Sequence, residues 1–163
     1  MMEKEDYHVR EVYAHYGLAM YSAQSLEKAI CILLTAETSD PKTMTKSDYD
    51  RILKSYFDKT FGVCIKKLNT TIEITPKLEE RLQNALEKRN LLAHTYFWDR
   101  AAHFMREDGR NYMIRELNEI TDFFEKLDSE ISEINHKWLS KLGISEDWIE
   151  KQMEKIIKNL TIA

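Results

Sequence analysis

The central helix of this chain is predicted by residues 75–96, which read TPKLEERLQNALEKRNLLAHTY. Thr75 can cap the start of a helix, and Pro76 fits the first helical position because no amide donor is missed there. Glu79 and Glu80 suit the positive end of the helix dipole. The sequence therefore predicts a helix that begins near Pro76 and runs at least to about the end of this segment.

An apolar stripe runs along this helix, and an arginine lies in the middle of it. Because an α-helix advances about 100° per residue, seven residues fall on one apolar arc: Leu78, Leu82, Ala85, Leu86, Leu92, Ala93 and Tyr96. Arg89 falls at the centre of this arc, and a guanidinium buried without a partner is costly. Asn90 and His94 share the rim of the arc, being four residues apart. Leu91 points to the wet side, which indicates a second contact surface.

Two interpretations of these polar residues are open at this point. In the first, Arg89 is buried against a carboxylate such as Glu27, and His94 is a core histidine with satisfied hydrogen bonds. Helix geometry alone favours this interpretation, since single polar residues on apolar faces are usually paired core groups. In the second, Arg89, Asn90 and His94 converge to form a polar site.

The first half of the chain also predicts helices. The 163 residues include only 4 Gly and 2 Pro, and a sequence with few breakers and many helix formers favours long helices. Apolar residues recur at three and four positions over about residues 4–37. A shorter helix follows a cap at Ser47 or a neighbour. Gly62 breaks or bends it, and Phe61 to Leu68 continues as another helical piece.

The second half predicts two more helices after the central one. Asp108-Gly109 signals a turn, after which an apolar stripe predicts a long helix that ends at Gly143. Ser145 can cap a last helix, whose apolar face comprises Trp148, Ile149, Met153, Ile156, Ile157 and Leu160. We therefore expect residues 1–163 to form one all-α domain, a bundle of about five main helices.

Composition narrows the classes of partner. The formal net charge is −4, which does not indicate a broadly basic nucleic-acid binder, and we expect no DNA partner. Residues 76–115 carry eight Lys or Arg and six Asp or Glu, a local bias that permits an anionic ligand. The first ten residues are rich in charged side chains, unlike a secretory signal, and the most apolar run, residues 29–34, is too short to span a membrane. We expect a cytoplasmic protein without a membrane partner.

Neither the cysteines nor the histidines predict a metal or cofactor site. Cys31 and Cys64 each lie in an apolar context and are expected to be buried free thiols. His103 and His136 lack carboxylate or cysteine neighbours at ligand spacing, so no metal or other cofactor is expected.

Residues 89–94, Arg-Asn-Leu-Leu-Ala-His, resemble the R-x4-6-H motif of HEPN domains, in which the residue after the arginine is typically polar. The resemblance implies a compact helical bundle with the motif near the end of its central helix. It also implies a metal-independent endoribonuclease that acts as a toxin or antiviral defence effector. In such an enzyme Arg89 would clamp the phosphate, His94 would be the acid/base, and Asn90 would orient them. Candidate RNA contacts flank the motif at Lys88, Trp98 and Arg100.

The motif extends to R-x4-H-x-Y through Tyr96. This resembles the toxins of HEPN/MNT toxin–antitoxin pairs, whose tyrosine is adenylylated by a partner nucleotidyltransferase. A cognate antitoxin or nucleotidyltransferase is therefore a possible partner, with Tyr96 as the modified residue. Tyr96 also falls on the apolar arc, which predicts a core position. The cluster Tyr96-Phe97-Trp98 can belong to the core or offer a stacking surface for an unpaired base.

The resemblance further implies a homodimer through the motif helix, with two Arg89/His94 sets at one cleft. The rim location of Asn90 and His94 and the exposed Leu91 motivate this expectation, and the pairing surface would continue from His94 into residues 96–98. Two alternatives remain: a non-catalytic HEPN-like module that binds a nucleotide, RNA or another protein, and a purely structural helical partner.

Overall fold

Helices make up nearly all of residues 4–40, 42–141 and 145–161, the ranges that the computed structural model describes. In chain order the elements are α1 (Lys4–Glu37), α2 (Lys46–Phe57), α3 (Phe61–Thr71), α4 (Pro76–Asn90), the π-helical turn η1 (Leu91–Thr95), α5 (Tyr96–Asp99), α6 (Ala101–Phe104), α7 (Glu107–Lys141) and α8 (Glu146–Thr161). These ranges contain no strand, so the all-α prediction is confirmed. The helices outnumber the five main ones expected, partly because the central helix continues into η1, α5 and α6.

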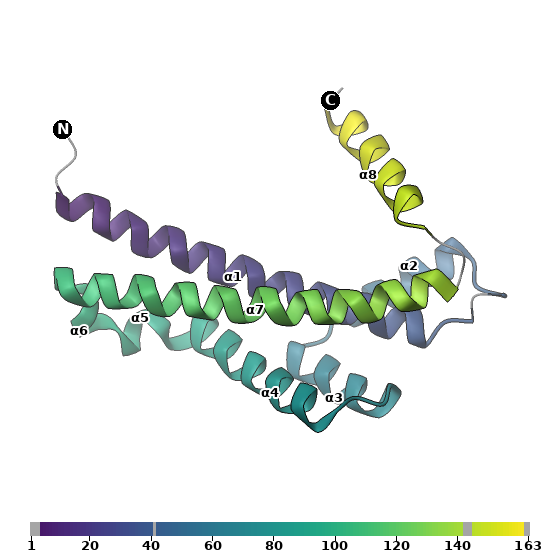
Figure 1. The fold of residues 1–163 in the computed structure, drawn as a ribbon, viewed down its shortest axis with the longest axis horizontal. Helices are drawn as coiled ribbons and strands as arrows, with labels where there is room; N and C mark the ends of the chain where they lie inside the picture. The colour runs from purple at the N-terminus through teal and green to yellow at the C-terminus, as the bar shows by residue number, and fades with distance from the viewer. Residues whose placement is uncertain (1–3, 41, 142–144, 162–163) are drawn as a thin grey trace.

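Two long helices form the frame of the bundle. Helices α1 and α7, of 34 and 35 residues, lie side by side along most of their length (Figure 1). Helices α3 and α4 pack on this frame, while α8 stands away from it in the same view. Within the described ranges, no helix combines the length and the low charge needed to cross a membrane.

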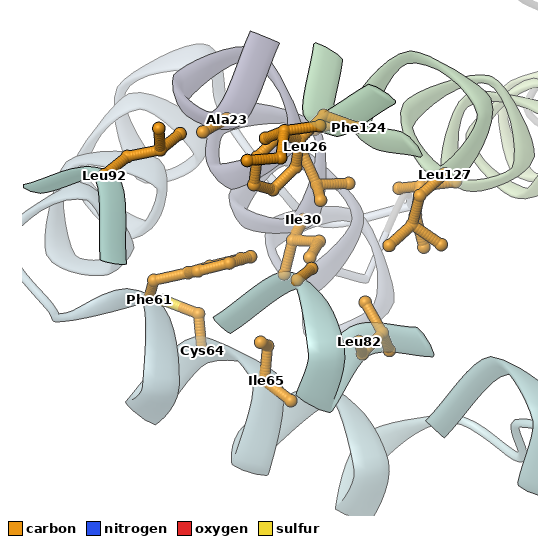
Figure 2. Close-up of a cluster of buried hydrophobic side chains, with 14 of the residues drawn as sticks. Ala23, Leu26, Ile30, Phe61, Cys64, Ile65, Leu82, Leu92, Phe124 and Leu127 are labelled. Carbon is orange, nitrogen blue, oxygen red and sulfur yellow. The ribbon is translucent and has the colours of Figure 1, made fainter. Parts of the chain in front are cut away.

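The core lies where four helices meet. Figure 2 shows Leu26 and Ile30 of α1 between side chains of α7 on one side and of α3 and α4 on the other. Phe124 and Leu127 of α7 are fully buried, as is Leu82 of α4. Full burial of such side chains stabilises the fold by roughly 1.5–3 kcal/mol each. The apolar arc of the central helix is therefore part of the core.

Capping residues set the helix starts that the sequence predicts. The Thr75 side chain accepts a hydrogen bond from the Leu78 N–H, and the Ser145 hydroxyl accepts one from the Trp148 N–H at 3.2 Å. For α2 the cap is Thr45, a neighbour of the expected Ser47, in a capping box with Asp48. Each bond satisfies a backbone donor that has no partner within the helix.

Two glycines differ from their predicted roles. The predicted turn at Asp108-Gly109 is wrong, because both residues belong to the first turn of α7. A Cβ at Gly109 would clash with the backbone carbonyl of His103, so glycine permits a close approach of backbones there. The predicted break at Gly62 is also wrong in position: α2 ends at Phe57, and Gly62 lies inside α3. The helix end predicted at Gly143 falls outside the described residues.

Candidate functional site: a π-helical turn in the Arg-Asn-x-x-x-His segment

The central helix changes its hydrogen-bond pattern inside the motif. The Tyr96 N–H bonds to the carbonyl of Leu91, five residues back, instead of to that of Leu92, four residues back. The carbonyl of Leu92 accepts a hydrogen bond from the Tyr16 hydroxyl of α1, at 2.7 Å. Such π-helical turns are rare and occur often at functional sites. No local sequence pattern reveals this contact, because Tyr16 and Leu92 are 76 residues apart.

The π-helical turn alters which residues share a face. Residues five apart are separated by about 140° on an α-helix, and hydrogen bonds that close at five residues reduce this separation. Arg89 and His94 are five apart, so η1 brings their directions closer together. The α-helical angles place Ala93 on the apolar arc, but Ala93 is exposed, and that prediction is wrong. Leu92 and Tyr96 are buried as expected.

Arg89 is paired with a carboxylate of α1. Its Nε lies 3.2 Å from Oε1 of Glu27, and the two side chains are 29% and 21% exposed. This ion pair confirms the partner that the apolar arc predicts for Arg89. An ion pair through Nε engages one of the five N–H donors of a guanidinium. Arg89 therefore points toward α1 and stays partly accessible to solvent.

His94 and Asn90 lie at the surface. Both are exposed, so the interpretation of His94 as a core histidine is wrong, and their placement at the rim is confirmed. Trp98 of α5 is 86% exposed, an unusual position for the largest apolar side chain. We call Asn90, His94 and Trp98 the motif face. These three side chains present an amide, an imidazole and an indole to solvent, and Arg89 of the same segment is partly exposed.

Tyr96 and Phe97 belong to the packed side of the same segment. Tyr96 is 1% exposed, and its ring lies 5.8 Å from that of Tyr16 and 5.6 Å from that of Phe97, between centroids. Its hydroxyl donates to the carbonyl of Met113 at 3.4 Å, and burial raises the pKa of Tyr96 above its usual value. The core interpretation of Tyr96 is confirmed. The aromatic cluster is thus divided, since only Trp98 is open to a ligand.

The flanking cations have protein partners. Arg100 contacts both carboxylate oxygens of Glu116, at 2.9 and 2.5 Å. Burial acts to raise the pKa of Glu116, but the hydrogen bonds and charge of Arg100 outweigh it and hold this pKa below its usual value. The Lys88 ammonium lies 5.4 Å from the centre of the Phe123 ring. The guanidinium of Arg100 is therefore already bound to Glu116 and is not free to contact RNA in this structure.

The expected position of Leu91 needs correction. Leu91 is half-buried and packs against the core instead of pointing into solvent. It lines a groove of about 590 Å³ between the central helix and α7, together with Lys88, Tyr112 and Phe123. The second contact surface indicated by the sequence is therefore α7 of the same chain. Leu91 gives no support to a dimer.

The motif contains an acid–base group, the imidazole of His94, and a phosphate-binding group, the guanidinium of Arg89. Among the described residues, no three His, Cys, Asp or Glu side chains gather where they could hold a metal ion.

Comparison of the chain with protein-family models, with curated proteins and with solved structures found no match.

Proposed function

We propose that this protein is a metal-independent endoribonuclease of the HEPN type, acting as a toxin or an antiviral defence effector. The observation that carries the proposal is the π-helical turn η1 within the motif. In this segment His94 and Asn90 are exposed, and Arg89 stays partly accessible to solvent. A turn that costs regular helical hydrogen bonding and coincides with an Arg/His motif favours a functional role for the segment.

The proposed reaction needs only groups that RNA and this segment supply. The 2′-hydroxyl attacks the adjacent phosphorus, and the bond to the 5′-oxygen breaks. The products are a 2′,3′-cyclic phosphate and a 5′-hydroxyl. His94 transfers the protons, because an imidazole can both accept and donate one. Arg89 donates hydrogen bonds to the phosphate as negative charge builds up, and Asn90 orients the reacting groups. Trp98 stacks on an unpaired base.

A second copy of the chain completes the proposed site. In-line attack benefits from both a base and an acid, and one chain supplies one His94 at the motif face. Two-fold pairing through the motif face, continuing toward residues 96–98, brings two Arg89/His94 sets to one phosphate. The same exposed face suits binding of a cognate antitoxin or nucleotidyltransferase. Adenylylation of Tyr96 would require its buried hydroxyl to become accessible.

One observation favours a second candidate function. Glu27 already neutralises Arg89, as expected for a guanidinium with a structural role. A non-catalytic module, in which the motif face binds a nucleotide, RNA or another protein, fits this ion pair without further change.

Cleavage by purified protein separates the two functions. We expect wild type to cleave single-stranded RNA in the presence of EDTA, leaving 2′,3′-cyclic phosphate ends, and to arrest growth when expressed. His94→Ala should abolish both effects. His136→Ala is the matched control, because His136 is an exposed histidine on α7. Equal, intact RNA with wild type and His94→Ala would favour the binding module.

A further inference from the structure

Two thiols from distant parts of the chain meet in the core. Cys31 of α1 and Cys64 of α3 are free, and their Sγ atoms lie 3.9 Å apart. A disulfide bond is about 2.05 Å long, so the sulfur atoms must approach each other by roughly 2 Å. Both thiols are buried, at 5% and 2% exposure, and α1 and α3 pack directly against each other. Bond formation therefore requires rotation of the side chains or a shift of the helices.

A polar cavity gives these thiols access to small molecules. Cys31 and Cys64 line a space of about 160 Å³, whose other walls include both rings and charges: Glu27, Lys28, Phe57, Lys59, Phe61 and Arg89. A water molecule occupies about 30 Å³ in the liquid, so the space admits a peroxide group. Three cations and one carboxylate make this wall electropositive, which favours a thiolate.

The two thiols differ in character. The two sulfur atoms share a hydrogen bond in which either can be the donor. Donation from Cys31, together with the nearby Lys59, lowers the pKa of Cys64 despite its burial. The same hydrogen bond and burial raise the pKa of Cys31. With the shared proton on Cys31, Cys64 is the attacking thiolate and Cys31 is the thiol that reacts with it afterwards.

We propose that Cys31 and Cys64 form a peroxide-oxidised thiol pair that closes to an intramolecular disulfide between α1 and α3. The Cys64 thiolate attacks one peroxide oxygen, the O–O bond breaks, and the departing oxygen takes a proton to leave as water or an alcohol. Cys64 is then a sulfenic acid. The Cys31 sulfur attacks the Cys64 sulfur, the S–S bond forms, and the S–O bond breaks. The hydroxyl leaves as water with the Cys31 proton. Two thiols are oxidised and one hydroperoxide is reduced.

The proposal is independent of RNA cleavage, since its readout is covalent. Native protein is treated with hydrogen peroxide, denatured, and alkylated with a maleimide. Because the chain has only these 2 cysteines, intact mass reports the product directly. We expect a monomer lighter by two hydrogen atoms and without a maleimide adduct, and a tryptic peptide pair that joins Cys31 to Cys64. Two adducts per chain at every peroxide concentration, or a disulfide-linked dimer on a non-reducing gel, would overturn the proposal.

Single substitutions test the order of attack. In Cys31→Ser we expect the Cys64 sulfenic acid to accumulate and to be trapped by dimedone. In Cys64→Ser we expect Cys31 to remain a thiol at the same peroxide concentration. Circular dichroism checks that each variant keeps its helices, and the wild-type mass measurement stands if either variant fails to fold. Equal dimedone labelling of both variants would contradict the assigned roles.

Discussion

At the residue scale, the ion pair between Arg89 and Glu27 bears on whether Arg89 is available to bind a phosphate. If Arg89 clamps phosphate, the carboxylate of Glu27 competes with the substrate for it. If Arg89 is only structural, Glu27 is its necessary partner. Both residues are less than a third exposed, so their interaction is stronger than that of an open surface pair.

Replacing Glu27 by Gln distinguishes these roles. The amide keeps the size of the side chain and an acceptor for the Arg89 Nε–H, but removes the charge that competes with phosphate. We expect the KM for RNA to fall severalfold and the free energy of unfolding to fall by about 1 kcal/mol. Glu37→Gln, at an exposed position of α1, removes the same charge elsewhere and is the control. Loss of cleavage in Glu27→Gln, with Glu37→Gln unaffected, would show that the ion pair itself is required.

The ion pair of Glu116 with Arg100 makes the stability of the fold depend on pH in the acid range. The pKa of Glu116 is lowered in the folded protein, because Arg100 outweighs the effect of burial. A lowered pKa contributes stability above the unfolded-state value of 4.5, and this stability is lost as the pH falls through the folded-state value. We expect Glu116→Gln to unfold at a lower temperature than wild type at about pH 7, and the gap to shrink toward about pH 3. Thermal melts at both pH values measure the gap, and a gap that stays constant would contradict the assignment.

At the element scale, η1 depends on a hydrogen bond from another helix. The Tyr16 hydroxyl of α1 satisfies the Leu92 carbonyl, which has lost its α-helical partner. A buried or half-buried carbonyl without a partner costs about 1–3 kcal/mol. Tyr16 therefore holds the π-helical turn in place without belonging to the motif face.

Tyr16→Phe tests this dependence with the loss of one oxygen atom. We expect the thermal midpoint to fall by several degrees, amide exchange at Tyr96 to change, and RNA cleavage to weaken although Tyr16 makes no proposed substrate contact. Tyr13→Phe is the control, since Tyr13 is an exposed tyrosine three residues earlier on the same helix. If Tyr16→Phe matches wild type in amide exchange, another group must satisfy the Leu92 carbonyl.

Local patterns predict the elements well and their exceptions poorly. Helix starts are predictable because a cap such as Thr75 acts within three residues of itself. The partner of Arg89 is predictable because a buried guanidinium requires a carboxylate, and Glu27 was available on α1. The path of the chain after Asn90 is not, because a uniform rotation of 100° per residue assumes α-helical hydrogen bonds. The turn predicted at Gly109 is wrong for a related reason. This glycine permits a close approach to the His103 backbone, which a local turn signal does not contain.

At the scale of the whole molecule, the distribution of charge bears on the proposed binding of RNA. The net charge of −4 repels a polyanion, whereas residues 76–115 carry an excess of basic side chains. Arg100 is neutralised by Glu116 and Arg89 by Glu27, so a single chain concentrates little free positive charge near the motif face. Pairing of two chains would add their contributions at one place, and RNA binding should weaken as salt rises.

A composite dimer provides the test of this arrangement. Arg89→Ala and His94→Ala chains are each expected to be inactive. Every site of the first protein lacks Arg89, and every site of the second lacks His94. Mixed and allowed to exchange subunits, they form heterodimers in which one intact Arg89 and one intact His94 are present across the interface. Since two-fold pairing brings both sets to one phosphate, we expect partial recovery of cleavage in proportion to the heterodimer fraction. A mixture with His136→Ala in place of His94→Ala controls for simple dilution. A fully active protein that sediments as a monomer at the assay concentration would rule out the shared site, and the proton transfers would then belong to one His94.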